Sequence, residues 1–143
     1  MNIKIRKATQ ADSSIIYHFI CFLEEYSFDE KQFRENYAEG LEDENNLFLI
    51  AELEGEVIGF LSACRLLALH RGGITYQIQE LFITRAYREK GISKLLLEAF
   101  EEQLEGTAYQ GLSVSIRPTN TEARKMYEKA GYNNTHIHLV KTK

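Results

Sequence analysis

The feature that most constrains the fold is a change in hydrophobic period at Gly91. Before it, residues 76–84 alternate apolar and polar side chains, which is typical of a β-strand. After it, apolar residues recur every three or four positions to about Glu105 and so predict a helix, whose inner face holds Ile92, Leu95, Leu96, Ala99 and Phe100. Alternation returns over 111–117. A strand, helix and strand of these lengths predict a right-handed parallel crossover, a βαβ unit.

The preceding part of the chain has the pattern of an antiparallel meander. Ile3 and Ile5 indicate a short first strand, and residues 47–53 and 57–67 predict two longer ones joined by a turn at 54–56. The glycines of the 72–73 pair break the chain before the strand at 76–84, which we expect to pair back on its predecessor.

Three helices and a final strand or hairpin are also expected around this framework. Thr9-x-x-Asp12 resembles a capping box and opens a helix ending near Glu25, with an inner stripe of Ile15, Ile16, Phe19, Phe22, Leu23 and Tyr26. Asp29 can cap a second helix that carries Phe33, Tyr37 and Leu41. Thr119-x-x-Glu122 opens a last helix with Ala123, Met126, Tyr127 and Ala130 inward, ended by Gly131 and followed by a strand or hairpin over 132–140. The predicted fold is α/β, a mixed and mainly antiparallel central sheet with flanking helices and a C-terminal βαβ unit.

Length and composition exclude several classes of protein. The 143 residues suit a single domain over 1–143, and no apolar stretch approaches the ~20 residues that span a bilayer. A net charge of −4 argues against a general nucleic-acid binder. Cys21 and Cys64 lie outside any CxxC spacing, so they predict neither a zinc site nor a redox dithiol. Without a secretion signal at the N-terminus, we expect a cytoplasmic protein, and the sequence leaves a homodimer open.

The loop between the 76–84 strand and the following helix suits a diphosphate. A glycine at a helix start leaves several backbone N–H groups unpaired, where the helix dipole also favours negative charge. Gly91 would let the backbone approach the phosphates, and Arg88, Lys90 and Lys94 would add positive charge. A simple strand-to-helix turn with a solvated basic rim explains the same residues, because short glycine motifs are not specific.

Two segments of the sequence resemble the GNAT superfamily of N-acetyltransferases. Arg88-Glu89-Lys90-Gly91-Ile92-Ser93 resembles the acetyl-CoA signature Arg/Gln-x-x-Gly-x-Gly/Ala, and Asn120-x-x-Ala123-x-x-x-Tyr127-x-x-x-Gly131-Tyr132 resembles the second part of the family signature. Their order and spacing are those of the family, and the expected elements resemble its fold along nearly the whole chain. Ser93 replaces the usual glycine or alanine and Arg85 a frequent proline, so we expect weaker or slightly reshaped cofactor binding.

The resemblance implies acetyl-CoA as cosubstrate and a set of residues that bind it. In the family the fourth and fifth strands splay apart, and pantetheine pairs with backbone groups at positions matching Leu81 and Ile83, while an N–H near Phe82 polarises the thioester carbonyl. The implied cofactor-binding residues are Leu81, Phe82, Ile83, Arg88, Glu89, Lys90, Gly91, Ile92, Ser93, Lys94 and Asn120. Asn120 also has the usual sequence meaning of a helix cap.

Two residues are predicted to carry the chemistry. Glu80 is the candidate base, since we expect it to share a strand face with Ile78 and Phe82, where apolar neighbours would raise its basicity. A structural glutamate, paired with arginine or exposed at an edge, is the alternative. Tyr127 occupies the family position of an acid that protonates the leaving thiolate, and a core aromatic residue is its alternative.

The resemblance implies a primary amine of a small molecule as the acceptor. Ile78-Gln79-Glu80-Leu81 and the C-terminal tail resemble the aminoalkylphosphonate N-acetyltransferases, and cations for a phosphonate are available at Arg65, His70, Arg71, His136 and Lys141. Polyamines, aminoglycosides, amino acids and protein amines stay open, as does a catalytically silent acyl-CoA sensor. Phe28, Phe33 and Tyr37 line the acceptor pocket or belong to the core. His136 and His138 share a strand face, but without a third ligand we assign no metal.

Overall fold

The computed structural model describes residues 1–143. Its elements follow the predicted order: β1 (Ile3–Lys7), α1 (Ser13–Glu24), α2 (Glu30–Glu42), β2 (Asn46–Leu53), β3 (Glu56–Ala68), β4 (Gly73–Ile83), α3 (Ile92–Gln103), β5 (Gly111–Val114) and α4 (Thr121–Lys129). Short 3-10 turns precede α1, join β3 to β4 and follow β4. None of the helices is long and apolar enough to cross a bilayer.

The five strands form one sheet in the order β1-β2-β3-β4-β5. The first three pairings are antiparallel, and only β4 and β5 run parallel, with α3 as the crossover between them. The α/β prediction of a mixed, mainly antiparallel sheet with a C-terminal βαβ unit is therefore confirmed. The β2–β3 turn has positive φ at Glu54 (49°) and Gly55 (83°), the combination that a two-residue hairpin needs.

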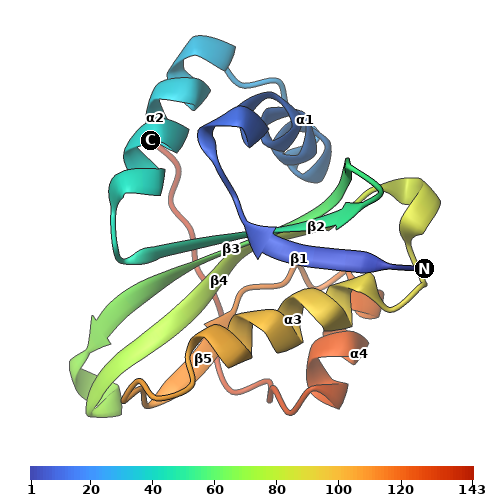
Figure 1. Ribbon diagram of the computed structural model, residues 1–143. Coiled ribbons are helices and arrows are strands. Elements are labelled where there is room, and N and C mark those ends of the chain that lie inside the picture. Colours follow the sequence, from blue (N-terminus) through green and yellow to red (C-terminus); the bar gives the residue numbers. More distant parts are fainter.

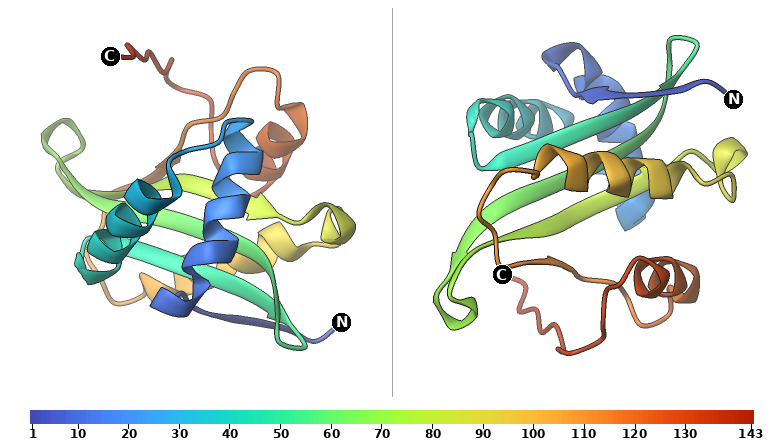
Figure 2. Two further views of the ribbon diagram at one scale, coloured as in Figure 1. Left: turned by 90° about the horizontal axis from the view of Figure 1, so that it is seen from above. Right: turned by 60° about the horizontal axis from the view of Figure 1, so that its bottom comes forward.

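Helices cover both faces of the sheet. Figure 1 shows α1 and α2 on one side and α3 and α4 on the other, and Figure 2 shows the same layers from two further directions. The larger core cluster lies on the α3 side around the fully buried Leu96 and Phe100. The smaller one lies beneath α1 and α2 and contains Phe19, Phe60 and Phe82. Alternate side chains of the strands supply the two clusters.

Helix α2 begins where the sequence predicts, whereas Thr9 opens a 3-10 turn over Gln10–Asp12 and α1 follows it at Ser13. Asp29 caps α2 by accepting hydrogen bonds from the N–H groups of Lys31 and Gln32. The inner stripe of α1 is narrower than expected, because Ile16 and Phe19 are buried while Phe22 and Tyr26 are 75% and 63% exposed. Tyr26 lies beyond the end of α1, which stops at Glu24 before the left-handed residue Glu25, and Phe22 stacks at the edge of β4 with its ring 6.4 Å from that of Phe82.

The C-terminal prediction is wrong. Residues 132–140 form no strand, and Ile137, Leu139 and Val140 are 87%, 87% and 75% exposed. The strand expected over 111–117 is also shorter, since β5 ends at Val114. Alternation of apolar and polar residues shows only that a segment could form a strand with one buried face. A strand also needs a neighbouring backbone to pair with, and residues 132–140 have no such partner. Ala130, expected to point inward, is exposed, and it follows the end of α4.

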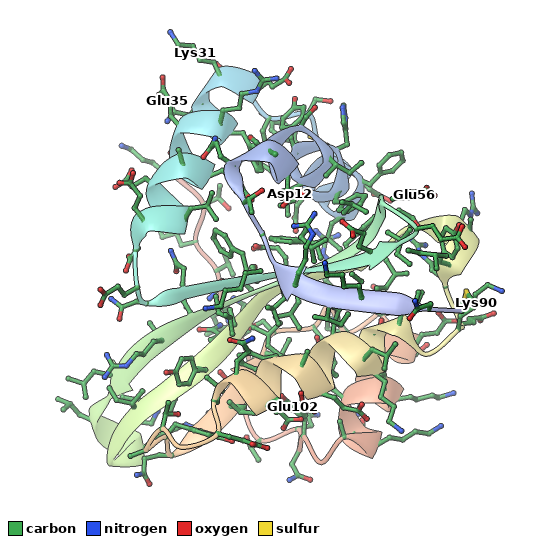
Figure 3. The ribbon with its side chains drawn as sticks, in the orientation of Figure 1. Asp12, Lys31, Glu35, Glu56, Lys90 and Glu102 are labelled. Carbon is green, nitrogen blue, oxygen red and sulfur yellow. The ribbon has the colours of Figure 1, made fainter.

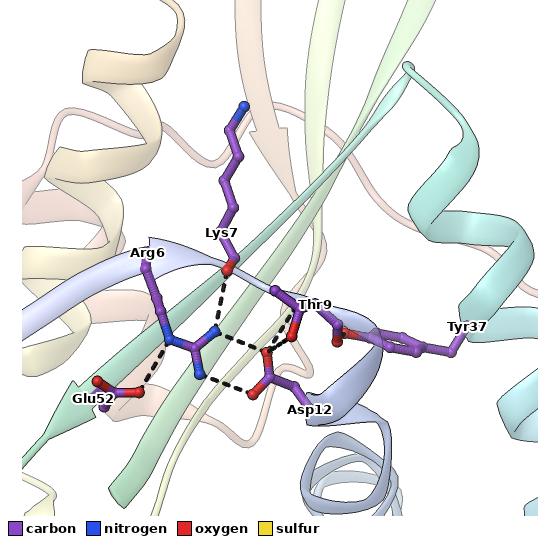
Figure 4. A network of polar contacts seen from close by, with 6 residues as sticks. All are labelled: Arg6, Lys7, Thr9, Asp12, Tyr37 and Glu52. Carbon is purple, nitrogen blue, oxygen red and sulfur yellow. Dashed lines mark hydrogen bonds and ion pairs between the residues drawn. The ribbon is translucent and has the colours of Figure 1, made fainter. Parts of the chain in front are cut away.

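A polar network ties the start of α1 to the first strands (Figure 4). Arg6 binds both carboxylate oxygens of Asp12 at 2.8 and 2.9 Å and reaches Glu52 at 3.1 Å. Asp12 also accepts from the Thr9 N–H, and the hydroxyl of Tyr37 donates to the Thr9 carbonyl at 2.7 Å. The predicted capping box is thus present, and the Arg6 guanidinium holds the pKa of Asp12 below its usual range, although burial opposes this.

We expect Asp12→Asn to destabilise the fold by about 1.5–3 kcal/mol at pH 7, the range for hydrogen bonds to charged groups. Because the pKa of Asp12 is lowered in the folded state, its contribution is present above the unfolded pKa and is lost as pH falls through the folded pKa. Urea unfolding from pH 7 to pH 2 should give a shallower acid limb for the variant. Glu30→Gln, which breaks an exposed pair with Arg34 on α2, is the control and should change stability by less than about 0.5 kcal/mol.

Candidate active site

The sheet opens at a β-bulge in β4. Ser62 of β3 pairs with Glu80 and Ala63 pairs with Ile78, so Gln79 is an extra residue in β4. Pairing of β4 with β5 runs from Thr75 to Ile78 and stops at this bulge. Beyond it the N–H and C=O groups on that edge of β4 have no strand partner, as the family resemblance implies.

A groove of about 1140 Å³ occupies the opening. Its walls come from the end of α1, the second half of β4, the first turns of α3, the segment after β5 and one face of α4. All of the predicted cofactor-binding residues line it except Lys90, as do both predicted catalytic residues. Lys90 is exposed and points away from the body of the protein (Figure 3).

Glu80 lies half-buried in this groove against a buried serine. The Ser62 hydroxyl donates to Oε1 of Glu80 at 2.5 Å and accepts from the Glu80 N–H at 3.1 Å. Burial raises the pKa of Glu80, the Ser62 hydrogen bond lowers it, and the negative charge of Glu24 raises it further. The net pKa is above the usual range of a glutamate. Glu80 forms no hydrogen bond or ion pair with an arginine, so the alternative of an arginine-paired structural glutamate does not apply.

The neighbours of Glu80 differ from those expected. Phe82 shares its face of the sheet and belongs to the cluster beneath α1 and α2, but Ile78 belongs to the cluster on the α3 side. The extra residue at Gln79 inverts the alternation, so two residues that are separated by one position point to opposite faces. The apolar surroundings of Glu80 therefore come from the α1 side.

The start of α3 presents free backbone donors to the groove. The first hydrogen bond of the helix runs from Leu95 N to Gly91 O at 3.2 Å, so the N–H groups of residues 92–94 have no helical partner. Gly91 has φ +78°, no side chain caps the helix, and a Cβ on Gly91 would enter open space. Such a cradle suits a phosphate group. Ser93 stands at its edge, half-buried, with its N–H available.

Arg88 has a second role that sequence reasoning missed. Its Nε donates to the Ile83 carbonyl at 3.0 Å, and its guanidinium lies 5.5 Å from the centre of the Phe82 ring. Arg88 therefore fixes the end of β4 against the loop. The carbonyl of Ile83 already has this partner, which leaves Leu81 and the N–H groups as the freer backbone sites of the edge.

Helix α4 places its two motif residues differently. Tyr127 is 4% exposed, packs edge-on against Tyr132 at 5.3 Å and lines the groove, and burial raises its pKa above the usual range. It is thus both a core aromatic and a groove residue. Asn120 caps the helix, as one of its two predicted roles, since its side chain accepts from the Ala123 N–H at 3.1 Å; the Thr119-x-x-Glu122 box expected at this helix start lies one residue earlier than the cap. Asn120 also lines the groove, so its two predicted roles are compatible in space.

The predicted acceptor residues are not brought together. Tyr37 is buried and stacks between Phe33 and Phe48, which makes it core, and none of Phe28, Phe33 and Tyr37 lines the groove. The predicted cations Arg65, His70, Arg71, His136 and Lys141 also lie outside it, on the β3–β4 hairpin and in the exposed tail. The sequence indicated that these cations lie near strand ends, but the β3–β4 hairpin and the tail do not line the groove.

Cations other than those predicted for the acceptor line the groove. The cations that line the groove are Arg88, Lys94, Arg117, Lys125 and Lys129. His136 and His138 lie in the exposed tail, and no group of three side chains is arranged to hold a metal ion. Cys21 and Cys64 are free, half-buried thiols. The sequence analysis did not identify Arg117 or Ser62 as site residues. The sequence offered one signal for Arg117, its place just before the only proline, and none for Ser62, whose pairing with Glu80 depends on the bulge.

Known proteins with this sequence pattern and fold support the same interpretation. The chain is 29% identical to an aminoalkylphosphonate N-acetyltransferase from Salmonella typhimurium, over 96% of this chain and 90% of that one. Its fold is similar to that of a transcriptional regulator from Bacillus halodurans, with TM-score 0.90, 19% identity and coverage of 99% and 100%. An aminoglycoside N-acetyltransferase in complex with CoA gives TM-score 0.86, 18% identity and coverage of 99% and 95%. Residues 13–132 match the acetyltransferase (GNAT) family. The chain therefore belongs to the GNAT family of acetyl-CoA-dependent N-acetyltransferases.

Proposed function

We propose that this enzyme acetylates the primary amine of a small molecule that also carries an anionic group, with a short aminoalkylphosphonate as the first candidate. One observation carries the proposal: a single groove joins the phosphate cradle at the start of α3 to Glu80 and Tyr127. The likeness to the Salmonella aminoalkylphosphonate enzyme supports the choice of acceptor.

The free backbone N–H groups at the start of α3 indicate which end of the groove would bind the cosubstrate. Acetyl-CoA, when bound, supplies an acetyl group activated as a thioester. The N–H groups of residues 92–94 would hold its diphosphate, and Arg88 and Lys94 would add charge at the same place. The unpaired edge of β4 near Leu81 would hold the pantetheine amides.

The acceptor end contains the base. An alkylammonium with pKa ~10 must lose a proton before it can attack, and Glu80 would accept that proton directly or through water. Its raised pKa makes it a better acceptor than an exposed carboxylate. Tyr127 is protonated at neutral pH, since the ordinary pKa of a tyrosine is about 10 and burial raises it further, and it would donate this proton to the departing sulfur.

We expect acetyl-CoA to stabilise the fold by about 2.7 kcal/mol at 100 times its Kd. Gly91→Leu should abolish most of this shift, since the side chain would project into the groove. Gly106→Leu is the matched control: Gly106 also has positive φ (83°) and open space at its Cβ, but it lies outside the groove. Both variants should lose a similar stability without ligand, about 1–2 kcal/mol, and only Gly91→Leu should lose the thermal shift. Equal shifts in both would refute the phosphate cradle.

A CoA-release screen over an amine panel tests the proposed activity. The panel needs aminoethylphosphonate, spermidine, an aminoglycoside, an amino acid and a lysine peptide. Turnover that is fastest with aminoethylphosphonate supports the proposal, and faster turnover of spermidine or the peptide rejects the acceptor class. Binding of acetyl-CoA with no CoA release for any amine favours the silent sensor instead.

We also propose that the chain acts as a single catalytic domain in the cytoplasm and as a homodimer. Apolar side chains exposed on the β3–β4 hairpin, Leu66, Leu67 and Leu69, support self-association, since a second copy would cover them. Light scattering of the wild type and of Leu67→Glu tests this: a wild-type monomer would contradict it.

A further inference from the structure

One ion pair crosses the mouth of the groove at its acceptor end. Nη2 of Arg117, in the segment after β5, lies 3.1 Å from Oε2 of Glu24 at the end of α1. Both side chains line the groove together with Glu80. Glu24 is near enough for its charge to act on Glu80, so the pair lies beside the proposed base rather than at the phosphate cradle.

The backbone holds Arg117 in place. Residues 117–120 form a turn with Pro118 in its second position, closed by a hydrogen bond from Asn120 N to Arg117 O at 2.9 Å. The same Asn120 caps α4. Arg117 is therefore presented by a rigid turn that is fixed to a helix, and its side chain remains 66% exposed at the groove.

The pair is well placed to exchange partners. Its two side chains are 66% and 44% exposed, and ion pairs of this kind are weak because water screens them. A guanidinium binds a phosphonate or carboxylate through two parallel hydrogen bonds, which a single bond to Glu24 does not use. Two of the other groove cations lie toward the phosphate cradle: Arg88 donates to the Ile83 carbonyl, and Lys94 faces Glu98 at 3.8 Å on the first turns of α3. Lys125 and Lys129 lie on α4, so Arg117 is the groove cation that is paired with Glu24 beside Glu80.

We infer that Arg117 and Glu24 select a zwitterionic acceptor, in which Arg117 binds the anionic end and Glu24 attracts the ammonium end toward Glu80. A molecule that carries both charges satisfies each half of the pair when it separates them. A simple alkylamine satisfies only Glu24 and leaves Arg117 without a partner. This inference rests on the proposed function and adds to it the residues that read the acceptor.

The experiment measures two acceptors of similar length, aminoethylphosphonate and propylamine, in the wild type and in Arg117→Gln. We expect Arg117→Gln to lower kcat/KM for aminoethylphosphonate at least about tenfold, chiefly through KM, and to change kcat/KM for propylamine less than about twofold. Arg117→Lys should recover part of the loss, because it restores the charge without the planar fork. Arg124→Gln, which removes a similar exposed pair with Glu128 on α4 outside the groove, should change neither.

Calorimetric titration of aminoethylphosphonate into the protein with CoA separates this inference from the proposed reaction. Binding to the wild type that weakens about tenfold in Arg117→Gln supports the inference even if no CoA is released, in which case only the proposed function fails. An unchanged ratio of the two kcat/KM values would overturn the selection by Arg117, and an equal loss for both amines would mean that the ion pair only holds the groove together. Absence of aminoethylphosphonate binding to the wild type would also overturn the inference.

Discussion

Tyr127→Phe should lower kcat by about 10²–10⁴-fold at pH 7 while the Kd for acetyl-CoA stays the same, the range for loss of a positioned general acid. The change keeps the ring, which packs in the core, and removes only the hydroxyl. Burial and the neighbouring Tyr132 raise the pKa of Tyr127, so the hydroxyl is protonated throughout the neutral range and available to the leaving sulfur.

Tyr132→Phe is a control of the same chemistry a short distance away. The two rings are 5.3 Å apart, but the Tyr132 hydroxyl is buried without a hydrogen-bond partner and does not line the groove. Its removal should leave turnover unchanged and keep or raise the melting temperature, because an unsatisfied buried polar group disappears. Steady-state CoA release and thermal melts of both variants decide the matter; full turnover in Tyr127→Phe would return this residue to a core role.

Local patterns were sufficient to predict most of the fold. The period change at Gly91 fixed the strand, loop and helix of the βαβ unit, and Asp29 and Asn120 act as helix caps because a cap depends on only three or four neighbouring residues. The C-terminal tail shows the limit of such patterns. Its alternation is real, but whether a strand forms depends on a partner elsewhere, which periodicity does not report.

The sequence motifs of the candidate site could be predicted, but the long-range contacts between its side chains could not. Gly91 and Tyr127 could be located through the resemblance of their segments to the family signature. The Ser62–Glu80 hydrogen bond and the Arg117–Glu24 ion pair join residues 18 and 93 positions apart, and both depend on how β4 is distorted and how the segment after β5 returns to α1. One extra residue at Gln79 also decides which face Glu80 occupies.

Glu80→Gln should lower the rate by about 10²–10⁴-fold at neutral pH, since the amide cannot accept the proton of the ammonium. The carboxylate acts as a base only above its own pKa, which burial raises, so the wild-type rate should fall as pH drops through that raised value. Ser62→Ala removes the hydrogen bond that lowers the pKa of Glu80. Its acidic limb should therefore move to higher pH with the plateau rate largely kept.

Stability gives the independent check on Glu80. A carboxyl whose pKa is raised by folding opposes the folded state above that folded pKa, and the penalty vanishes below the unfolded pKa of about 4.3. Glu80→Gln should thus melt higher than the wild type at pH 7 and at the same temperature near pH 4, while the Ser62 hydroxyl can still donate to the amide oxygen. Glu102→Gln, on the outer side of α3, should change neither rate nor melting temperature appreciably. An inactive but more stable Glu80→Gln identifies a carboxylate kept for chemistry, whereas normal turnover, or a loss of rate together with a loss of stability, would make Glu80 a structural residue.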